Sequence, residues 1–399
     1  MSPPGMRSTA RPRIVFIAPT PAPYRAFFYD ELARRLPQYR FLAIFQEGAW
    51  SDMQWKDDRP HRMRSLALRP LDLGRLSDVP VIQRVNPGMR RILERAAPDA
   101  IVTHALGTPT GKAISHWARR RRVPFFLRCD TNFTSEMEKS TLRRALRGLT
   151  FRFEMRRAFG ALSLGVMNEA VYTYYGLGPE RQYRVPFLID ADAMARRADE
   201  ERATGEMRGR LGIRSSRVLL FVGRLRPIKG VSELLEAFLE LHAEFPDVDL
   251  LIVGDGPLKE TLQARAGRLL GTRVHMPGFL QPDAVARCFG AADVCVAASR
   301  NEPWGLVLNE AMAAGTAVIT THYFAAAADL LAEPGAGRLV PRDDPCALAD
   351  CLRSLLSQPG LLPEMGRKAR SQHSRWISLH DPVDGVARAL QAALRRKAR

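Results

Sequence analysis

Short runs of apolar residues alternate with stretches of helical periodicity along most of the chain. In the first half, the apolar runs that predict buried strands occupy residues 13–18, 41–45, 65–68, 99–103, 124–128 and 160–164. Between them, apolar residues recur every three or four positions, as expected for helices, over 25–36, 82–96, 111–122 and 142–158. Strands that alternate with helices in this way are typical of a parallel sheet covered by helices.

The pattern weakens over residues 190–216, which are polar, and then starts again. Strands are expected at 217–222, 249–253, 273–276, 294–297 and 317–321, and helices at 231–244, 258–270, 305–314, 345–357 and 383–396. Two such units predict an α/β fold with two doubly wound, Rossmann-like domains over 1–190 and 191–375, and a basic helix in 376–399 that packs back on the first domain. Ligands of such domains bind beyond the carboxyl ends of the strands, so the site is expected in a cleft between them.

Composition narrows the class of protein. The 399 residues are 46% hydrophobic and 26% charged, which is typical of a folded globular chain. No window approaches the ~18 consecutive apolar residues of a membrane span, and the apolar run behind the basic N-terminus is too short for a secretion signal. Five cysteines without a C-x-x-C pair argue against a disulfide framework and a structural zinc site. We therefore expect a cytoplasmic protein, in which the glycosylation pattern Asn132-Phe-Thr has no consequence.

The positive charge is unevenly distributed. The formal charge is +18, and residues 1–200 hold 34 Lys and Arg against 20 Asp and Glu, so most of the excess lies in this half. Such asymmetry indicates an anionic partner, which can be nucleic acid, a membrane surface or an acidic substrate. No zinc-finger, RRM or homeodomain pattern is present, and aromatic residues do not interleave with the basic runs, so nucleic acid is not the expected partner.

Residues 142–158 indicate that the anionic partner is a membrane surface. Six arginines alternate there with apolar residues: Arg143, Arg144, Arg147, Arg152, Arg156 and Arg157 with Leu142, Leu146, Leu149, Phe153 and Met155. A basic amphipathic helix can lie on an anionic bilayer, and residues 119–122 extend the basic patch. The competing interpretation is a surface helix whose apolar side packs on its own sheet. We expect peripheral attachment to an anionic membrane surface.

The most specific chemical pattern is Glu302-Pro-Trp-Gly-Leu-Val-Leu-Asn-Glu310, which follows an expected strand and opens an expected helix. The free N–H groups at a helix N-terminus attract phosphate, and here they belong to Gly305, Leu306 and Val307. Glu310 lies further into this helix, where a carboxylate accepts hydrogen bonds from paired hydroxyls such as those of a ribose. Glu302 precedes the helix in a loop expected to face the cleft.

Two further turns follow expected strands. The first contains Gly223, Arg224 and Lys229, and its two cations can clamp a diphosphate, Arg with a planar fork and Lys as a point charge. The second contains Gly254 and Gly256, and it begins like a dinucleotide fingerprint. Position 259 is Lys where the third glycine would stand, so binding of NAD is not expected.

Together these three elements resemble the retaining GT-B glycosyltransferases of family four, over essentially the whole chain and most strongly over 217–321. The resemblance implies a nucleotide-sugar donor, a glycan or lipid-linked acceptor of bacterial surface polysaccharide or lipopolysaccharide synthesis, and neither a metal nor a cofactor. It assigns donor binding to Gly223, Arg224, Lys229, Gly254, Gly256, Gly305, Leu306, Val307 and Glu310, and catalysis to Glu302 and His104.

On the acceptor side the resemblance is weaker. The glycine pair that the family usually carries in its first loop is replaced here by residues 20–25, and the acceptor side is expected to include Tyr24, Arg25 and Asp130. For His104, the alternative is a packed residue at a strand end. Another GT-B enzyme, such as an epimerase or a sugar phosphorylase, is the competing function.

Overall fold

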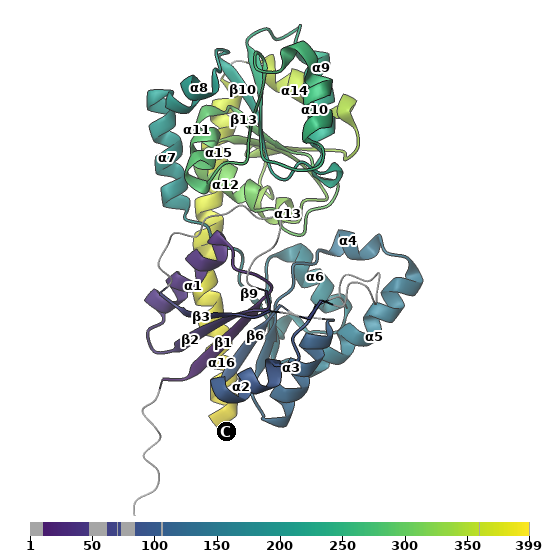
Figure 1. Cartoon of the computed structure of the whole chain (residues 1–399), viewed down its shortest axis with the longest axis vertical. Helices are drawn as coiled ribbons and strands as arrows, with labels where there is room; N and C mark the ends of the chain where they lie inside the picture. Colours follow the sequence, from purple (N-terminus) through teal and green to yellow (C-terminus); the bar gives the residue numbers. More distant parts are fainter. Residues whose placement is uncertain are drawn as a thin grey trace, which may run out of the picture.

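Two parallel sheets, each covered by helices, form the molecule (Figure 1). The computed structural model describes residues 11–47, 62–69, 71–72, 84–104, 107–358 and 360–398. In this article the seven-stranded sheet and its helices are the first domain, and the six-stranded sheet and its helices are the second domain. The expected architecture of two α/β units is confirmed.

The first sheet has the strand order β3-β2-β1-β6-β7-β8-β9, with every pair parallel. Its inner strand β1 is apolar after its first residue and buried on both faces, because helices cover both sides of the sheet. The strands are β1 (Arg13–Ala18), β2 (Arg40–Phe45), β3 (Arg64–Ala67), β6 (Ala100–Thr103), β7 (Phe125–Leu127), β8 (Gly160–Ser163) and β9 (Gln182–Arg184).

The helices of the first domain are α1 (Pro23–Arg35), α2 (Met89–Ala96), α3 (Pro109–Arg120), α4 (Phe133–Met137), α5 (Thr141–Arg157) and α6 (Val166–Tyr174). The helix expected over 82–96 begins only at Met89, so its predicted start is wrong. The chain before it forms β5 (Arg84–Val85), which pairs antiparallel with β4 (Leu71–Asp72), and Pro87-Gly88 separates this strand from the helix. Positions 82 and 83 lie outside the described residues.

The second sheet has the order β12-β11-β10-β13-β14-β15, again with parallel pairs. Its strands are β10 (Arg217–Val222), β11 (Val248–Val253), β12 (Val274–Gly278), β13 (Val294–Ala297), β14 (Ala317–Thr321) and β15 (Gly337–Val340). Its helices are α7 (Ala191–Thr204), α8 (Glu206–Leu211), α9 (Val231–Leu241), α10 (Lys259–Ala266), α11 (Pro282–Ala291), α12 (Leu306–Ala314), α13 (Ala327–Leu330), α14 (Pro345–Leu356) and α15 (Leu361–Leu379). The polar stretch 190–216 therefore contains two helices that the pattern did not predict.

The last helix returns to the first domain. Helix α16 (Pro382–Ala398) packs against β6, β8 and β9, and its Val383, Val386 and Leu390 belong to the core under the first sheet. Helix α15 precedes it and packs on α12 and β14 of the second sheet. The yellow C-terminal segment of Figure 1 therefore runs along both domains.

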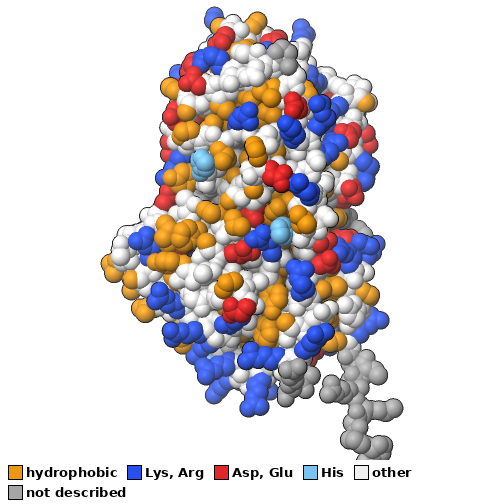
Figure 2. All heavy atoms as spheres, turned by 180° about the vertical axis from the view of Figure 1, so that it is seen from behind, with side chains coloured by type: hydrophobic (Ala, Val, Ile, Leu, Met, Phe, Trp, Pro, Cys, Tyr) orange, Lys and Arg blue, Asp and Glu red, His pale blue; other side chains and the backbone are white. Residues whose placement is uncertain are grey.

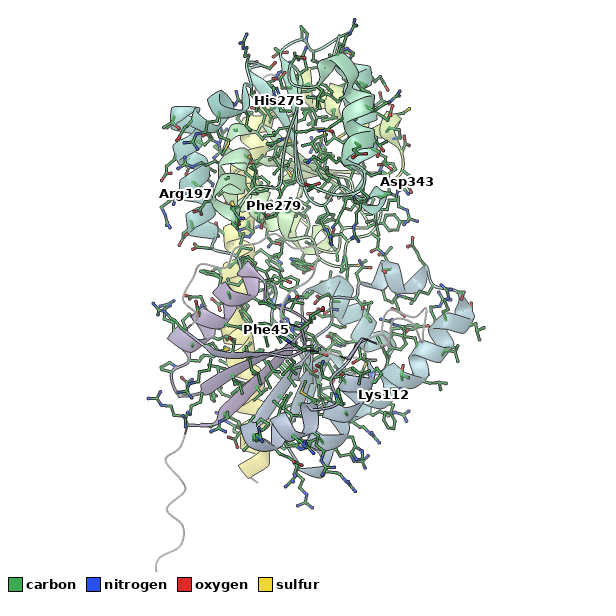
Figure 3. The ribbon with its side chains drawn as sticks, viewed as in Figure 1. Phe45, Lys112, Arg197, His275, Phe279 and Asp343 are labelled. Carbon is green, nitrogen blue, oxygen red and sulfur yellow. The ribbon has the colours of Figure 1, made fainter. Side chains whose placement is uncertain are left out.

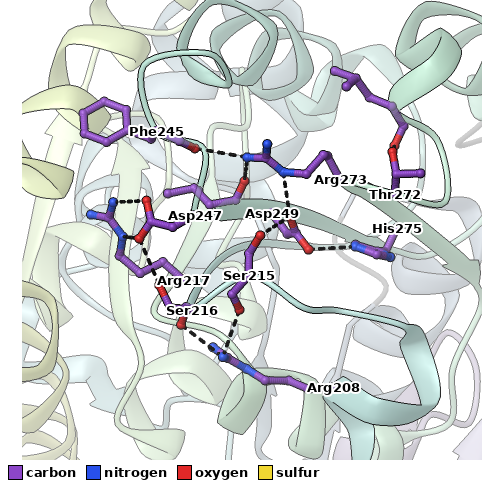
Figure 4. A network of polar contacts seen from close by, with 12 residues as sticks. Arg208, Ser215, Ser216, Arg217, Phe245, Asp247, Asp249, Thr272, Arg273 and His275 are labelled. Carbon is purple, nitrogen blue, oxygen red and sulfur yellow. Dashed lines mark hydrogen bonds and ion pairs between the residues drawn. The ribbon is translucent and has the colours of Figure 1, made fainter.

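A buried polar network fixes the second sheet at the end away from the first domain (Figure 4). The Asp249 carboxylate on β11 accepts hydrogen bonds from Ser215 Oγ at 2.6 Å, Arg273 Nε at 2.9 Å and His275 Nε2 at 3.0 Å. In Figure 3, His275 lies on β12 far from the first domain, whereas Phe279, just past the carboxyl end of this strand, lies near it. The carboxyl ends of the second sheet therefore point toward the first domain.

Candidate active site

Helix α12 opens toward the first domain with its N-terminal N–H groups uncapped by any side chain. The chain enters the helix through Gly305, whose φ is +91°. A Cβ at this position would lie 1.8 Å from the Phe324 ring, so only glycine fits. Leu308 N–H bonds back to the Gly305 carbonyl at 3.1 Å, which leaves the N–H groups of Leu306 and Val307 at the helix end. This end is suited to a phosphate group.

Lys229 and Glu302 form an ion pair beside this helix. Lys229 ends a 3₁₀ turn (Pro227–Lys229), and Glu302 is held by its backbone, which donates to Tyr323 O at 3.0 Å and accepts from Ala325 N at 3.1 Å. An ammonium group has three N–H donors, and Glu302 takes one of them. Lys229 therefore keeps donors for an anion while Glu302 fixes its position.

Glu310 lies one turn into α12 and is half-buried. Burial raises the pKa of its carboxyl group to about 7. The neighbouring Asn309 amide oxygen accepts the indole N–H of Trp304 at 2.9 Å, which ties the helix to the loop before it. Glu310 is therefore poised to accept hydrogen bonds from hydroxyl groups close to neutral pH.

The glycines of the two other turns allow close backbone packing. A Cβ on Gly254 would lie 1.8 Å from the Gly223 carbonyl oxygen, and one on Gly256 would lie 2.6 Å from the Leu225 carbonyl oxygen. These turns cross each other at the carboxyl ends of β10 and β11, with Arg224 half-buried between Gly223 and Leu225. The structure thus gives Gly254 and Gly256 a packing role, and their contact with a donor stays a prediction.

A cavity of about 240 Å³ faces this region from the first domain. It is lined by Pro19, His104, Cys129, Asp130, Thr131, Arg147 and Phe151. Oδ1 of Asp130 is buried there without a hydrogen-bond partner. The Arg147 guanidinium stacks 4.2 Å from the Phe151 ring centre and lies 3.3 Å from the fully buried Glu136 carboxylate. The cavity thus presents an unpaired acceptor and a fixed cation to a polar ligand.

His104, Tyr24 and Arg25 meet in a smaller adjoining pocket, which also includes Arg128 and Phe187. Burial, together with the positive charges of Arg25 and Arg128, holds the pKa of His104 well below its usual value, so the ring is neutral. Burial raises the pKa of Tyr24 to about 12. Arg25 donates to the Thr20 carbonyl at 2.9 Å, so its side chain stabilises the loop where the family usually has glycines.

The loop that follows β7 connects the cavity of the first domain to the Glu302 loop of the second domain. Asn132 Nδ2 donates to the Glu302 carbonyl at 2.9 Å, and Asn132 directly follows the cavity residues Asp130 and Thr131. This hydrogen bond places Glu302, of the predicted donor side, next to the loop that holds Asp130, of the predicted acceptor side.

Sequence reasoning missed three residues of this region. The sequence places Arg147 among the arginines of a membrane-facing helix, yet its side chain lines the cavity. Its position four residues before the buried Phe151, on the same helix face, was the available signal. Arg128 and Asn132 follow a strand end, and nothing in their local pattern distinguishes them from other loop residues.

Two Rossmann-like domains, with an uncapped helix N-terminus of the second opening toward the first, form the architecture of the GT-B glycosyltransferases. A family model described as glycosyl transferases group 1 matches residues 204–372. A phosphatidyl-myo-inositol mannosyltransferase of Mycobacterium leprae is 31% identical over 277 residues, which cover 68% of each chain. The chain belongs to the glycosyl transferases of group 1.

Other matches agree with this family, either over a shorter part of the chain or at lower sequence identity. The corresponding mannosyltransferase of Mycolicibacterium smegmatis is 41% identical over 150 residues, which span 37% of this chain and 38% of the relative. The crystal structure of Anabaena HepE in complex with UDP has a TM-score of 0.72 at 20% identity, covering 95% of this chain and all of the other. At this identity the structural match establishes the fold.

Proposed function

We propose that the protein is a retaining, metal-independent glycosyltransferase. It moves a sugar from a nucleoside diphosphate sugar to a hydroxyl group of a glycan or lipid-linked acceptor. The observation that carries this proposal is the placement of the Lys229–Glu302 pair and the open end of α12 opposite the cavity of Asp130 and Arg147. One side offers groups for a diphosphate leaving group, and the other offers groups for a hydroxylated acceptor.

The donor binds in the second domain. Lys229, Arg224 and the N–H groups at the start of α12 hold the diphosphate, and Glu310 accepts hydrogen bonds from the ribose hydroxyls. When the bond between the anomeric carbon and the diphosphate breaks, negative charge grows on the leaving phosphate. Fixed cations and backbone donors stabilise that charge without needing to reorganise. The UDP bound to HepE is consistent with such a donor.

Transfer proceeds on the face of the sugar from which the diphosphate leaves. The acceptor oxygen forms the new bond to the anomeric carbon, and its proton passes to a leaving phosphate oxygen. Glu302 orients Lys229 and the donor sugar, and the neutral His104 ring offers a hydrogen bond to the sugar without adding charge. This front-face route fits a site in which we find no side chain placed as a nucleophile among the described residues.

The acceptor enters the cavity of the first domain. Asp130 Oδ1 accepts from an acceptor hydroxyl, and Arg147 donates to a second oxygen of the acceptor. The relatives named as phosphatidyl-myo-inositol mannosyltransferases act on a lipid that carries a polyol, which favours a lipid-linked acceptor here. We place the reaction in the cytoplasm, in the synthesis of bacterial surface polysaccharide or lipopolysaccharide.

The membrane part of the proposal rests on helix α5. This helix buries Gly148, Phe151, Glu154 and Met155, yet it leaves a second apolar stripe exposed: Leu142, Leu146, Leu149 and Phe153. Arg143, Arg152 and Arg156 are exposed on this helix, whereas Arg144 and Arg147 are turned toward the protein. Figure 2 shows Lys and Arg gathered at the end of the first domain away from the second. The apolar stripe of α5, together with the exposed arginines of the same helix, is complementary to an anionic bilayer.

The described residues contain no helix that has the length and apolar character needed to cross a membrane.

A thermal-shift screen against nucleoside diphosphates and their sugars tests the donor, since a ligand that binds the folded state raises the melting temperature. We expect a shift with at least one nucleoside diphosphate and sugar transfer from the matching donor. Cleavage of a glycoside that depends on inorganic phosphate would instead indicate a phosphorylase. Salt-sensitive nucleic-acid binding that survives Glu310→Gln would indicate the nucleic-acid alternative.

Flotation with liposomes tests the membrane contact. The protein should float with anionic vesicles at low salt and less at high salt. Replacing Leu146 and Leu149 with Gln should abolish flotation, whereas Leu379→Gln serves as the control. Leu379 is 71% exposed, close to the 72% of Leu149, but it lies at the end of α15. Equal flotation of the variants would refute the α5 surface as the contact.

A further inference from the structure

Asn132 connects the loop of the acceptor cavity to the loop that carries Glu302. It is buried, with 1% of the residue exposed, and it stands at the N-cap of α4. Its Oδ1 accepts from Ser135 N at 2.7 Å, which is the ordinary capping bond of an Asn or Asp. Capping uses only the oxygen, so the Nδ2 group has a second role.

The Nδ2 group of Asn132 bonds to two residues of the second domain. Asn132 Nδ2 donates to the Glu302 carbonyl at 2.9 Å and to Asn301 Oδ1 at 3.2 Å. Asn301 Nδ2 in turn donates to Ser135 Oγ at 2.9 Å. The three residues Asn132, Asn301 and Ser135, which we call the amide clasp, thus join the start of α4 to the loop before α12.

Only an amide satisfies all these bonds. An Asp at position 132 keeps the cap, because a carboxylate also accepts from the helix N–H, but it has no donor for the Glu302 carbonyl. Its charge would also face two oxygen acceptors, the Glu302 carbonyl and Asn301 Oδ1. Ser and Thr, the other common capping residues, offer at most one donor on a shorter side chain.

We propose that Asn132 is a positioning residue for glycosyl transfer. It sets the Glu302 loop against the acceptor cavity when the two domains are closed, and it acts through Glu302 rather than on the sugar. Asp130 and Thr131 immediately precede it, so a shift of this loop also shifts the cavity wall. The inference rests on the proposed function, because it assigns Asn132 to the alignment of donor and acceptor.

The test compares Asn132→Asp with the wild-type protein. The nucleotide contacts lie in the second domain, so we expect an unchanged Kd for the nucleoside diphosphate and an unchanged KM for the donor. We expect kcat for transfer to fall about 10- to 100-fold, because misplacement of reacting groups by about 1 Å has effects of this size. Ser140→Ala is the control, since it removes the cap of the next helix, α5, without contact across the boundary.

A double-mutant cycle tests whether Asn132 and Asn301 act as one unit. Asn132→Ala and Asn301→Ala should each lower kcat, and the double variant should lose no more than the worse single variant, because both break the same clasp. Wild-type kcat in Asn132→Asp, or additive losses in the cycle, would overturn the inference. A wild-type protein that binds no nucleotide and transfers no sugar would instead overturn the proposed function.

Discussion

Glu302 holds the ammonium group of Lys229 in place beside α12. Removing this ammonium group should therefore weaken catalysis. Lys229→Ala removes a charge-assisted contact to the diphosphate, so kcat/KM should fall by about 10²–10³, equivalent to roughly 2.7–4 kcal/mol of transition-state stabilisation. Steady-state kinetics with the donor identified by thermal shift measures this. Lys368→Ala is the control, because it breaks the ion pair of an exposed lysine with Glu364 on α15. Wild-type turnover in Lys229→Ala would contradict the assignment.

Glu310 should make nucleotide binding depend on pH. Its pKa of about 7 means that the carboxylate form, the better acceptor for ribose hydroxyls, grows as the pH rises from 6 to 8. Wild-type affinity should therefore exceed that of Glu310→Gln by a factor that increases over this range to about tenfold. The titration of the nucleotide itself cancels in this ratio. Calorimetry of both proteins at pH 6, 7 and 8 measures it, and a ratio that is constant with pH would contradict the role of Glu310.

The same group should affect the stability of the nucleotide-free protein. A carboxyl whose pKa is raised by folding binds more protons when folded, so the free energy of unfolding falls as the pH rises from about 4.5 to about 7. Glu310→Gln should lack this part of the pH dependence. Denaturant unfolding of the two proteins across this range checks the sign.

Much of the donor side could be predicted from the residues alone. Its groups lie in short segments that follow strands, so one stretch of sequence such as 302–310 contains both the helix end and its carboxylates. The acceptor side combines residues from distant segments, such as His104, Asp130 and Arg147. Their meeting depends on the strand order β1-β6-β7, which local patterns do not encode.

At the level of elements, the buried strands were predicted closely because they are continuous apolar runs. The helices that were missed have weaker periodicity. Helix α7 buries only Ala198 and Glu201, and the buried face of α15 includes Gln372 and His373. Strand β15 lies at the sheet edge and is largely exposed, so its sequence carries little apolar signal. Tertiary packing, rather than local hydrophobicity, determines these elements.

The network at the start of β10, β11 and β12 should contribute to stability and not to binding. Asp249→Ala leaves Arg273 and His275 without their buried partner, so the free energy of unfolding should fall by about 3–5 kcal/mol. Asp247→Ala breaks the neighbouring ion pair between Asp247 and Arg217. The Asp247 side chain is 47% exposed, so the free energy of unfolding should fall by about 1 kcal/mol or less. Denaturant unfolding measures both, and the nucleotide Kd should be unchanged in each.

The pH dependence of this contribution has a defined sign. Burial alone would raise the pKa of Asp249, but hydrogen bonds from His275, Ser215 and Arg273 outweigh it and lower the pKa. The carboxylate therefore stabilises the fold above its ordinary titration range, and this stability is lost as the pH falls through the lowered pKa. In acid, the difference between wild type and Asp249→Ala should shrink, and a difference that persists would contradict this account.

At the scale of the whole molecule, the two domains contact each other at the start of helix α6. A residue of the second domain caps this helix of the first domain. Helix α6 of the first domain begins after Gly165 without a capping side chain of its own. Asp329 of the second domain supplies the cap, since its Oδ2 accepts from Val166 N at 3.0 Å, and Arg184 lies 3.6 Å from its other oxygen. The N-terminus of α6 therefore depends on an acceptor from the second domain, and the buried Asp329 carboxylate depends on partners from the first domain.

Gly165→Ala should separate the domains without disturbing either one. The φ of Gly165 is 176°, which any residue adopts, so the change adds no backbone strain. Its Cβ would lie 2.2 Å from Asp329 Oδ2 and 2.8 Å from the Trp304 ring, and both belong to the second domain. We expect a larger radius of gyration in solution scattering with bound nucleotide, and a kcat about tenfold lower or more, because closure aligns donor and acceptor. Gly88→Ala is the control, since a Cβ there meets nothing within 4 Å. If Gly165→Ala kept both the radius and the kcat of the wild type, contact at this point would not be needed for closure.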